Sequence, residues 1–363
     1  MKYTSSELCY IWLDSFLGLE YKHKRELYNY IDGKADIKNI IESAREYIVS
    51  AVGESVYNTV HSSATGEYLS YVLKGLDDRG VKAVTYVSKD YPKSLLDLPA
   101  PPFVLYAKGD TSLFNEKAFG IVGSRKSLPL SIKLAENYSK DLLDAGYVLV
   151  TGIAEGVDGA VLKTAVDNGG KVISVIAGGF DNVYPKTHQD LLEKVVKSGL
   201  AVSEYPPQTV PKPFHFPVRN RIIAGLSKGV LIVSGAMKSG TLYTAEYAEE
   251  YGKDLFAIPY SAGVSSGAGC NDLIKRGAHL TDTPEDILSF YGESKTERIE
   301  TYTDEEREIL RALSDGELHI EKLSGALKKD AFKLTPILSI LEIKGVVVKS
   351  GNVYGLTREY SEE

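Results

Sequence analysis

The sequence predicts an α/β protein with a Rossmann-like, doubly wound and mostly parallel sheet, and three observations support this fold class. From residue 118 onward, short apolar runs alternate with stretches of helical pattern. These runs are apolar throughout, which is typical of strands covered by helices on both faces. Glycine, serine, threonine or charged residues follow the runs, at the positions where such sheets place their ligand-binding loops.

The parallel strands are predicted from six apolar runs, at residues 120–122, 147–150, 172–177, 200–203, 230–233 and 255–258. Two further strands are predicted at 81–87 and 103–107, joined by a proline-rich segment that favours an extended loop. We expect these two strands to run along one edge of the sheet.

Three domains are predicted, because a chain of 363 residues exceeds the usual size of one. Residues 1–80 are predicted to form a helical domain of the SAM-like or helix-hairpin-helix-like kind, and residues 81–291 the Rossmann-like domain. The polar segment 292–303 is predicted to be a linker. Residues 304–357 show a winged-helix pattern, with helices at 304–313, 319–327 and 335–343 followed by a hairpin.

Composition excludes several classes of protein. No apolar run is long enough for a membrane span and the start lacks a signal-peptide pattern, so we expect a cytoplasmic protein without membrane contact. Two cysteines and six scattered histidines predict neither a disulfide framework nor a metal site, and no cofactor is expected. The net charge of −7 disfavours bulk binding to nucleic acid, but residues 117–290 carry equal numbers of basic and acidic side chains.

Gly123, Ser124 and Arg125 directly follow the first parallel strand. A glycine there lets backbone N–H groups approach an anion, while serine adds a hydroxyl and arginine a forked charged donor. The alternative is an ordinary turn with a surface arginine. Glycine-rich segments at 151–158 and 178–179 follow the next two strands, which favours a ligand lying across this edge of the sheet.

Lys186 follows Tyr184 and Pro185 in one loop. An aromatic face beside a cation suits the stacking of a base and the binding of its phosphate. The proline also allows a purely structural turn.

Arg219, Asn220 and Arg221 are predicted to lie at the start of a helix, close to Phe214 and Phe216. Helix N-termini attract anions, and basic residues mixed with aromatic ones are typical of a groove for single-stranded nucleic acid. Alternatively, the phenylalanines belong to the core and an arginine pairs with Glu204; this reading can hold for one of the two arginines.

Ser239, Gly240 and Thr241 open another predicted helix after the fifth strand. Their amides and hydroxyls could bind an anion, or they could simply cap the helix.

The chain resembles the DNA processing protein A family (DprA/Smf), because many separate motifs occur in the family's order. The resemblance is strong over about residues 80–290. It rests on Tyr91-Pro92, 102–109, Gly123-Ser124-Arg125, 151–158, 177–181, Tyr184-Pro185, 203–206, 216–227, Ser239-Gly240-Thr241, and 269–278.

The resemblance implies a core that binds single-stranded DNA in a positively charged pocket, forms a homodimer, protects incoming DNA and loads the RecA recombinase onto it in natural transformation or recombination. It implies no catalysis. The implied nucleic-acid-binding residues are Gly123, Ser124, Arg125, Lys186, Arg219, Asn220, Arg221, Ser239, Gly240 and Thr241. Leu162, Ser234 and Tyr260 depart from the residues that are usual in the family, which concerns the shape of the pocket more than the fold.

The alternative class is a nucleotide-binding or nucleotide-processing protein that resembles the phosphoribohydrolases of the same Rossmann variant, or a nucleotide-ligand sensor. Those enzymes carry a catalytic glutamate where this chain has Thr244, and a hydroxyl cannot replace a carboxylate as a base at neutral pH. The sequence therefore favours DNA binding. The C-terminal domain is expected to contact protein instead of reading duplex DNA, because its third helix offers few basic side chains.

Overall fold

The computed structural model describes residues 3–16, 19, 21–28, 37–294, 302–314, 316–343 and 345–357. The chain forms two compact units, Met1–Thr296 and Glu297–Glu363. The predicted boundary at residue 80 lies inside the first unit, between the last N-terminal helix and the first strand. Most of the predicted linker 292–303 lies outside the described residues.

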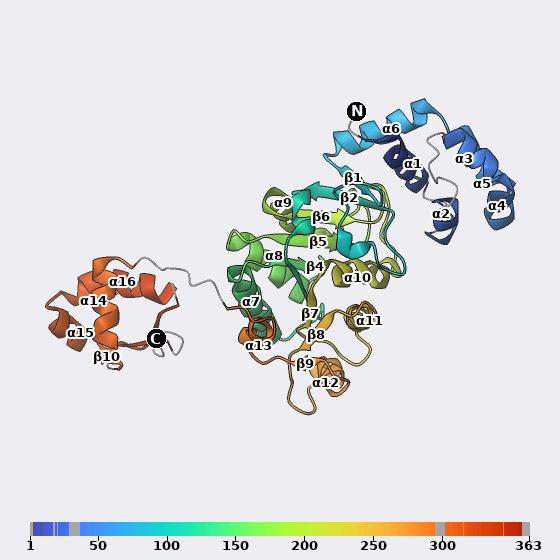
Figure 1. The fold of residues 1–363 in the computed structure, drawn as a ribbon. Coiled ribbons are helices and arrows are strands. Elements are labelled where there is room, and N and C mark those ends of the chain that lie inside the picture. Colours follow the sequence, from blue (N-terminus) through green and yellow to red (C-terminus); the bar gives the residue numbers. More distant parts are fainter. Residues whose placement is uncertain are drawn as a thin grey trace. The chain divides into compact units, whose positions relative to one another are not determined.

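A nine-stranded sheet in the order β1-β2-β6-β5-β4-β3-β7-β8-β9 forms the centre of the first unit (Figure 1). Its strands are β1 Lys82–Thr85, β2 Val104–Gly109, β3 Ala118–Val122, β4 Val148–Thr151, β5 Val172–Ile176, β6 Leu200–Ser203, β7 Gly229–Ile232, β8 Asp254–Ala257 and β9 His279–Leu280. Strands β3 to β9 pair in parallel, whereas β1 and β2 are antiparallel at one edge. The predicted mostly parallel sheet and its edge strands are confirmed. Strand β9, which is short and exposed, was not predicted.

Two layers of helices cover the sheet. One face packs against α7 Pro129–Asp144, α8 Val157–Asp167, α9 Gln189–Ser198 and α13 Pro284–Phe290. The other packs against α10 His215–Leu226, α11 Leu242–Glu250 and α12 Ala268–Lys275. Neighbouring residues of a strand serve different layers: in β4, Leu149 joins the first core while Val148 and Val150 join the second. Burial on both faces explains why these strands are apolar throughout.

Short 3-10 turns lie at Lys93–Leu95, Thr111–Asn115, Lys186–His188 and Ser265–Gly267.

The N-terminal helices share the core of the first sheet face. They are α1 Ser5–Asp14, α2 Tyr21–Tyr28, α3 Ile37–Ser43, α4 Arg45–Val52, α5 Glu54–Ser62 and α6 Gly66–Asp78. A capping box formed by Thr4 and Glu7 starts α1. At its end, the Asp14 carboxylate accepts a hydrogen bond from the Tyr106 hydroxyl at 2.8 Å and pairs with Lys24 at 2.9 Å. Buried polar contacts thus tie these helices to strand β2.

The second unit contains α14 Asp304–Leu313, β10 Leu318–His319, α15 Ile320–Leu327, α16 Ala331–Ile343, β11 Val347–Ser350 and β12 Val353–Leu356. The order of its three helices and hairpin is that of the predicted winged-helix pattern, and β10 adds a third strand beside β12. Helix α16 begins four residues before the predicted start at Thr335, with Pro336 inside it. Across the described ranges, no helix is long and apolar enough to cross a membrane.

Candidate nucleic-acid interface

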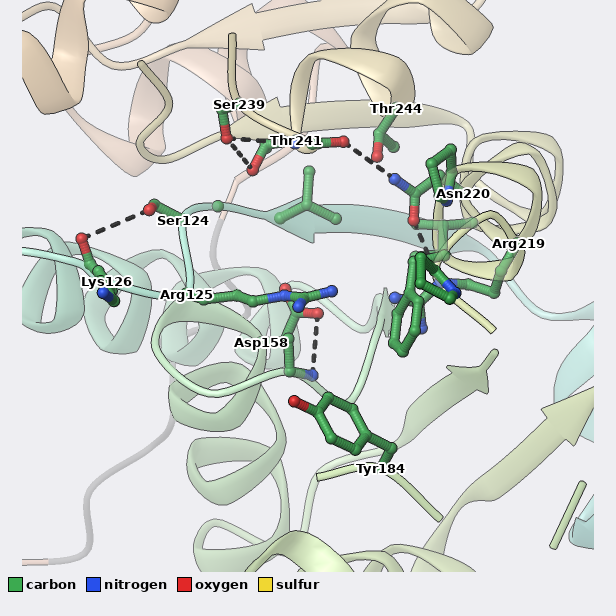
Figure 2. A pocket seen from close by; sticks show the side chains of 18 of the residues that line it. Ser124, Arg125, Lys126, Asp158, Tyr184, Arg219, Asn220, Ser239, Thr241 and Thr244 are labelled. Atoms are coloured by element: carbon green, nitrogen blue, oxygen red, sulfur yellow. Dashed lines mark hydrogen bonds between the residues drawn. The ribbon is translucent and has the colours of Figure 1, made fainter. Parts of the chain in front are cut away.

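A cavity of about 770 Å³ opens at the carboxyl edge of the sheet (Figure 2). It lies where the strand order reverses, since β3 is followed along the chain by β4, β5 and β6 on one side, and β7 and β8 return on the other. Crevices at such switch points are the usual ligand sites of open α/β sheets. The cavity is lined by Val122, Gly123, Ser124, Arg125, Lys126, Ala154, Asp158, Tyr184, Pro211, Pro213, Phe216, Pro217, Arg219, Asn220, Ile223, Ser239, Gly240, Thr241 and Thr244.

The Gly123–Arg125 loop forms one wall. A Cβ atom at Gly123 would lie 2.5 Å from Val157 Cγ2, so the close approach of α8 requires glycine. The Ser124 N–H donates to Ser234 Oγ at 3.1 Å, which shows that the departure at position 234 supports this loop. One of the amides expected to bind an anion is therefore already paired. The Arg125 side chain is exposed, with its guanidinium 4.8 Å from the centre of the Phe216 ring.

Asp158 lies at the cavity floor as the second residue of α8, and only 6% of it is exposed. Its Oδ2 accepts a hydrogen bond from the Ala154 N–H at 3.3 Å. Burial raises the pKa of Asp158, and the nearby Arg219 opposes this rise. The sequence placed Asp158 at the end of the glycine-rich segment 151–158, but this carboxylate was not among the predicted site residues.

Helix α10 begins at His215, so the predicted start at Arg219 is wrong. Pro217 stands in the first turn, where backbone N–H groups have no partner within the helix and proline is tolerated. Arg219 and Arg221 consequently lie inside the helix. Two residues correspond to about 200° of rotation around its axis, which points their side chains in nearly opposite directions.

Arg219 faces the cavity although only 5% of it is exposed. Its guanidinium donates to the Val175 carbonyl, and its Nε donates to Asn220 Oδ1 at 3.1 Å. Burial lowers the pKa of Arg219 to about 10, while the Asp158 carboxylate opposes this shift. The guanidinium therefore stays charged at neutral pH.

Arg221 points away from the cavity and forms a buried ion pair with Glu204. The Tyr21 ring lies 5.8 Å from its guanidinium. Burial lowers the pKa of Arg221, but the Glu204 carboxylate raises it. The net result is a raised pKa. Arg221 was predicted to contact nucleic acid together with the other cavity residues, and the structure corrects this placement. The alternative prediction, that one arginine pairs with Glu204, holds for Arg221.

Lys186 is exposed in the 3-10 turn Lys186–His188 and is not among the residues that line the cavity. Its neighbour Tyr184 does line the cavity, with 54% of the residue exposed. The rings of Tyr184 and Phe216 meet edge to face at 5.8 Å. The aromatic part of the loop thus lies where the sequence predicted, whereas the lysine lies outside.

The Ser239–Thr241 turn forms the opposite wall and leads into α11, for which Thr241 is the N-cap residue. Asn220 Nδ2 donates to the Gly240 carbonyl at 3.2 Å, and the Thr241 N–H donates to Ser239 Oγ at 3.3 Å. Eight predicted site residues are thus brought together: Gly123, Ser124, Arg125, Arg219, Asn220, Ser239, Gly240 and Thr241.

The charges of the lining favour an anionic ligand. Arg125, Lys126 and Arg219 are cationic, and Asp158 is the single carboxylate among the lining residues. Lys126 was missed, although its position beside Arg125 in the sequence could have indicated it. Within the ranges that the structure describes, no three metal-ligating side chains of the His, Cys, Asp or Glu type gather in one place.

A Rossmann-like domain with a cationic, aromatic-lined cavity at its switch point defines a class of proteins that bind anionic ligands at the carboxyl ends of strands. Within that class, the chain belongs to the family described as DNA recombination-mediator protein A, whose model matches residues 82–292. The predicted family is therefore confirmed.

Relatives and solved structures support this assignment. DNA processing protein DprA of Bacillus subtilis is 38% identical over 237 residues, which cover 65% of this chain and 78% of the relative. The X-ray structure of DNA processing protein A from Streptococcus pneumoniae has a TM-score of 0.68 and 32% identity, covering 80% of this chain and 98% of that one. DNA processing protein A from Helicobacter pylori, described for its single-stranded DNA binding mode, has a TM-score of 0.53 and 28% identity. The match covers 58% of this chain and 95% of that one.

Proposed function

We propose that this chain binds single-stranded DNA in the cavity at the switch point. The observation that carries the proposal is the placement of Arg125 and Arg219 beside the rings of Phe216 and Tyr184. Guanidinium groups bind phosphate oxygens, and aromatic faces stack on unpaired bases. A duplex conceals its base faces, so this combination favours a single strand. The Helicobacter pylori relative, described for its single-stranded DNA binding mode, supports the same ligand.

The test is a fluorescence-anisotropy titration with a labelled oligo-dT, a duplex of equal length and a mononucleotide, each at several salt concentrations. We expect the single strand to bind more tightly than the duplex. Its affinity should fall steeply with salt, because each neutralised phosphate releases counterions. Equal affinity for the duplex, or binding that is insensitive to salt, contradicts the proposal.

We further propose that the bound strand is protected and then passed to the RecA recombinase during transformation or recombination. The family description as a recombination mediator supports this role. A recombinase assay on DNA precoated with single-strand binding protein tests it. The chain should shorten the lag before RecA filaments form, and Arg125→Ala should lengthen that lag again. An unchanged lag with the wild-type chain contradicts the role.

We also propose that the chain acts as a homodimer, and that the cavity binds its ligand without catalysing a reaction. A dimer presents two cavities, and two linked sites raise the effective affinity for a strand that reaches both. Light scattering at several protein concentrations tests the dimer, and a persistent monomer contradicts it. Incubation with adenosine monophosphate tests the absence of catalysis, and release of free adenine contradicts it.

A further inference from the structure

A small recess of about 70 Å³ adjoins the large cavity. Both share Arg125, Ala154, Tyr184, Phe216 and Arg219, and the recess adds Ile153, Glu155 and Pro185. Figure 2 shows Arg125 and Tyr184 extending toward this common region from two different loops. Ligand pockets usually measure about 300–1000 Å³. The recess is therefore too small for a nucleotide, but it can accept the edge of a base whose ring lies in the large cavity.

Glu155 places a carboxylate at this recess. The side chain is exposed and immediately precedes Gly156, the N-cap residue of α8. Thr187 Oγ1 donates to Glu155 Oε1 at 3.4 Å. An ionised carboxylate only accepts hydrogen bonds and has about four acceptor positions, so most of its capacity remains for a ligand.

A carboxylate repels phosphate, so the group that Glu155 contacts on a DNA strand must be a base or a sugar. The rings of Tyr184 and Phe216, which line the same recess, favour a base because they offer it an apolar surface. In single strands, bases held on aromatic side chains expose their Watson–Crick edges to hydrogen-bonding groups. The recess thus combines a stacking surface with an acceptor for the edge of a base.

We propose that Glu155 gives this site a preference for guanine at one nucleotide of the bound strand; the inference rests on the proposed single-strand binding. Guanine carries N1–H and N2–H donors side by side, which match the two oxygens of a carboxylate. Thymine carries a single N3–H donor between two carbonyl oxygens. These oxygens are acceptors, so the carboxylate oxygens repel them. Hypoxanthine keeps N1–H but lacks the N2 amino group, so it ranks between them.

The test compares three oligonucleotides in a thymine background, with guanine, hypoxanthine or thymine at every fourth position, bound to the full chain. We expect the guanine oligonucleotide to bind on the order of fivefold more tightly than the thymine one. This is a small ratio for a pair of hydrogen bonds to one base, because the site is open to water. In Glu155→Gln the three affinities should converge, while binding to oligo-dT becomes tighter because a charge that repels phosphate is removed. The matched control Glu193→Gln, at an exposed position on α9, should keep the wild-type order.

An unchanged guanine-to-thymine ratio in Glu155→Gln, with single-strand binding intact, overturns the inference and leaves the proposed function standing. A lower melting temperature of Glu155→Gln without any change in the ratio also overturns it, because the carboxylate then only stabilises the start of α8. If the wild-type chain binds none of the three oligonucleotides, the proposed function itself fails. Melting curves of both variants separate loss of fold from loss of recognition.

Discussion

Asn220 connects two walls of the cavity: its Nδ2 donates to the Gly240 carbonyl at 3.2 Å, and its Oδ1 accepts from Arg219 Nε at 3.1 Å. The sequence predicted Asn220 as a residue that contacts nucleic acid. Within the protein, its amide oxygen and its amide nitrogen each form one hydrogen bond. Asn220 therefore orients the Arg219 guanidinium and holds the turn before α11.

We expect Asn220→Ala to weaken single-strand binding about three- to tenfold, because a hydrogen bond of this kind contributes about 1 kcal/mol. Anisotropy titration with oligo-dT measures the effect. Asn168→Ala is the matched control, since the Asn168 side chain donates to the Thr164 carbonyl at the end of α8, at an exposed position outside the cavity lining. Equal affinities of the two variants would show that Asn220 does not position the site.

Arg125→Ala should reduce the slope of log affinity against log salt by about 0.7, the contribution of one phosphate on a single strand. The Arg125 side chain is exposed, so its removal should change the free energy of unfolding by no more than about 0.5 kcal/mol. Salt titration and thermal melting are measured on the same preparation. Lys194→Ala, at an exposed position on α9, should leave the slope unchanged. A strongly lowered melting temperature of Arg125→Ala would make this arginine structural.

Asp158→Asn should alter the pH dependence of stability. Because burial raises the pKa of Asp158 in the folded chain, the folded state binds this proton more tightly than the unfolded state does. The resulting stabilisation is complete below the unfolded pKa and is lost as the pH rises through the folded pKa. The variant should therefore gain stability relative to the wild type as the pH rises above about 4, the ordinary pKa of an aspartate. Denaturant unfolding across this range measures the difference.

The exposed Asp167, at the end of the same helix, supplies a matched control for the exchange of an aspartate for an asparagine at the surface. Asp158→Asn should also tighten single-strand binding, because the neutral amide no longer competes with phosphate for Arg219. A variant that loses stability relative to the wild type toward neutral pH would mean that the attraction to Arg219 outweighs the cost of burial.

Purified protein incubated with adenosine monophosphate should release no adenine above the blank. A hydrolase needs an acid or base close to the reacting bond, and the carboxylate that lines the large cavity, Asp158, is buried beside the Arg219 guanidinium. Thr244, which the sequence resemblance aligns with the catalytic glutamate of phosphoribohydrolases, lies in the lining and offers a hydroxyl in place of a carboxylate. Chromatography detects the free base. Turnover that Glu155→Gln or Glu204→Gln abolishes would instead identify an enzyme.

Lys333→Glu should leave the affinity of the full chain for duplex DNA unchanged within about twofold. Lys333 is exposed in the first turn of α16, where a groove-reading helix would place a donor. Around it, the exposed side chains of Phe332 and Ile340 favour a protein contact. A duplex titration at low salt measures the effect. A severalfold loss would show that this unit does bind duplex DNA.

The parallel sheet could be predicted because burial on both faces leaves a local signal, an uninterrupted apolar run in each strand. The glycine-rich loops could be placed for a related reason, since parallel strands bring their carboxyl ends to one edge. Strand β9 was missed because two exposed residues carry no such signal. The starts of α10 and α16 were placed four residues too late, at Arg219 and Thr335, whereas these helices begin at His215 and Ala331.

The site was only partly predictable, because pairing across the fold leaves no pattern in the sequence. Glu204 follows β6 and Arg221 belongs to α10, and only the folded chain brings them together. The proximity of Arg125 to Phe216 likewise joins two distant segments. The sequence was compatible with ligand binding and with pairing to Glu204 for both arginines of α10, and only the structure shows that Arg219 faces the cavity and Arg221 pairs with Glu204.

The side chains of Arg219 and Arg221 extend from opposite faces of helix α10, Arg219 toward the cavity and Arg221 toward Glu204. Each residue turns an α-helix by about 100°, so a deletion or insertion of one residue before Arg219 would rotate both guanidinium groups by that angle. The Arg219 guanidinium would no longer face the cavity, and Arg221 would no longer pair with the buried Glu204 carboxylate. A substitution at Arg219 or Arg221 therefore affects one of the two sites, whereas a change in the length of the segment before them affects both at once.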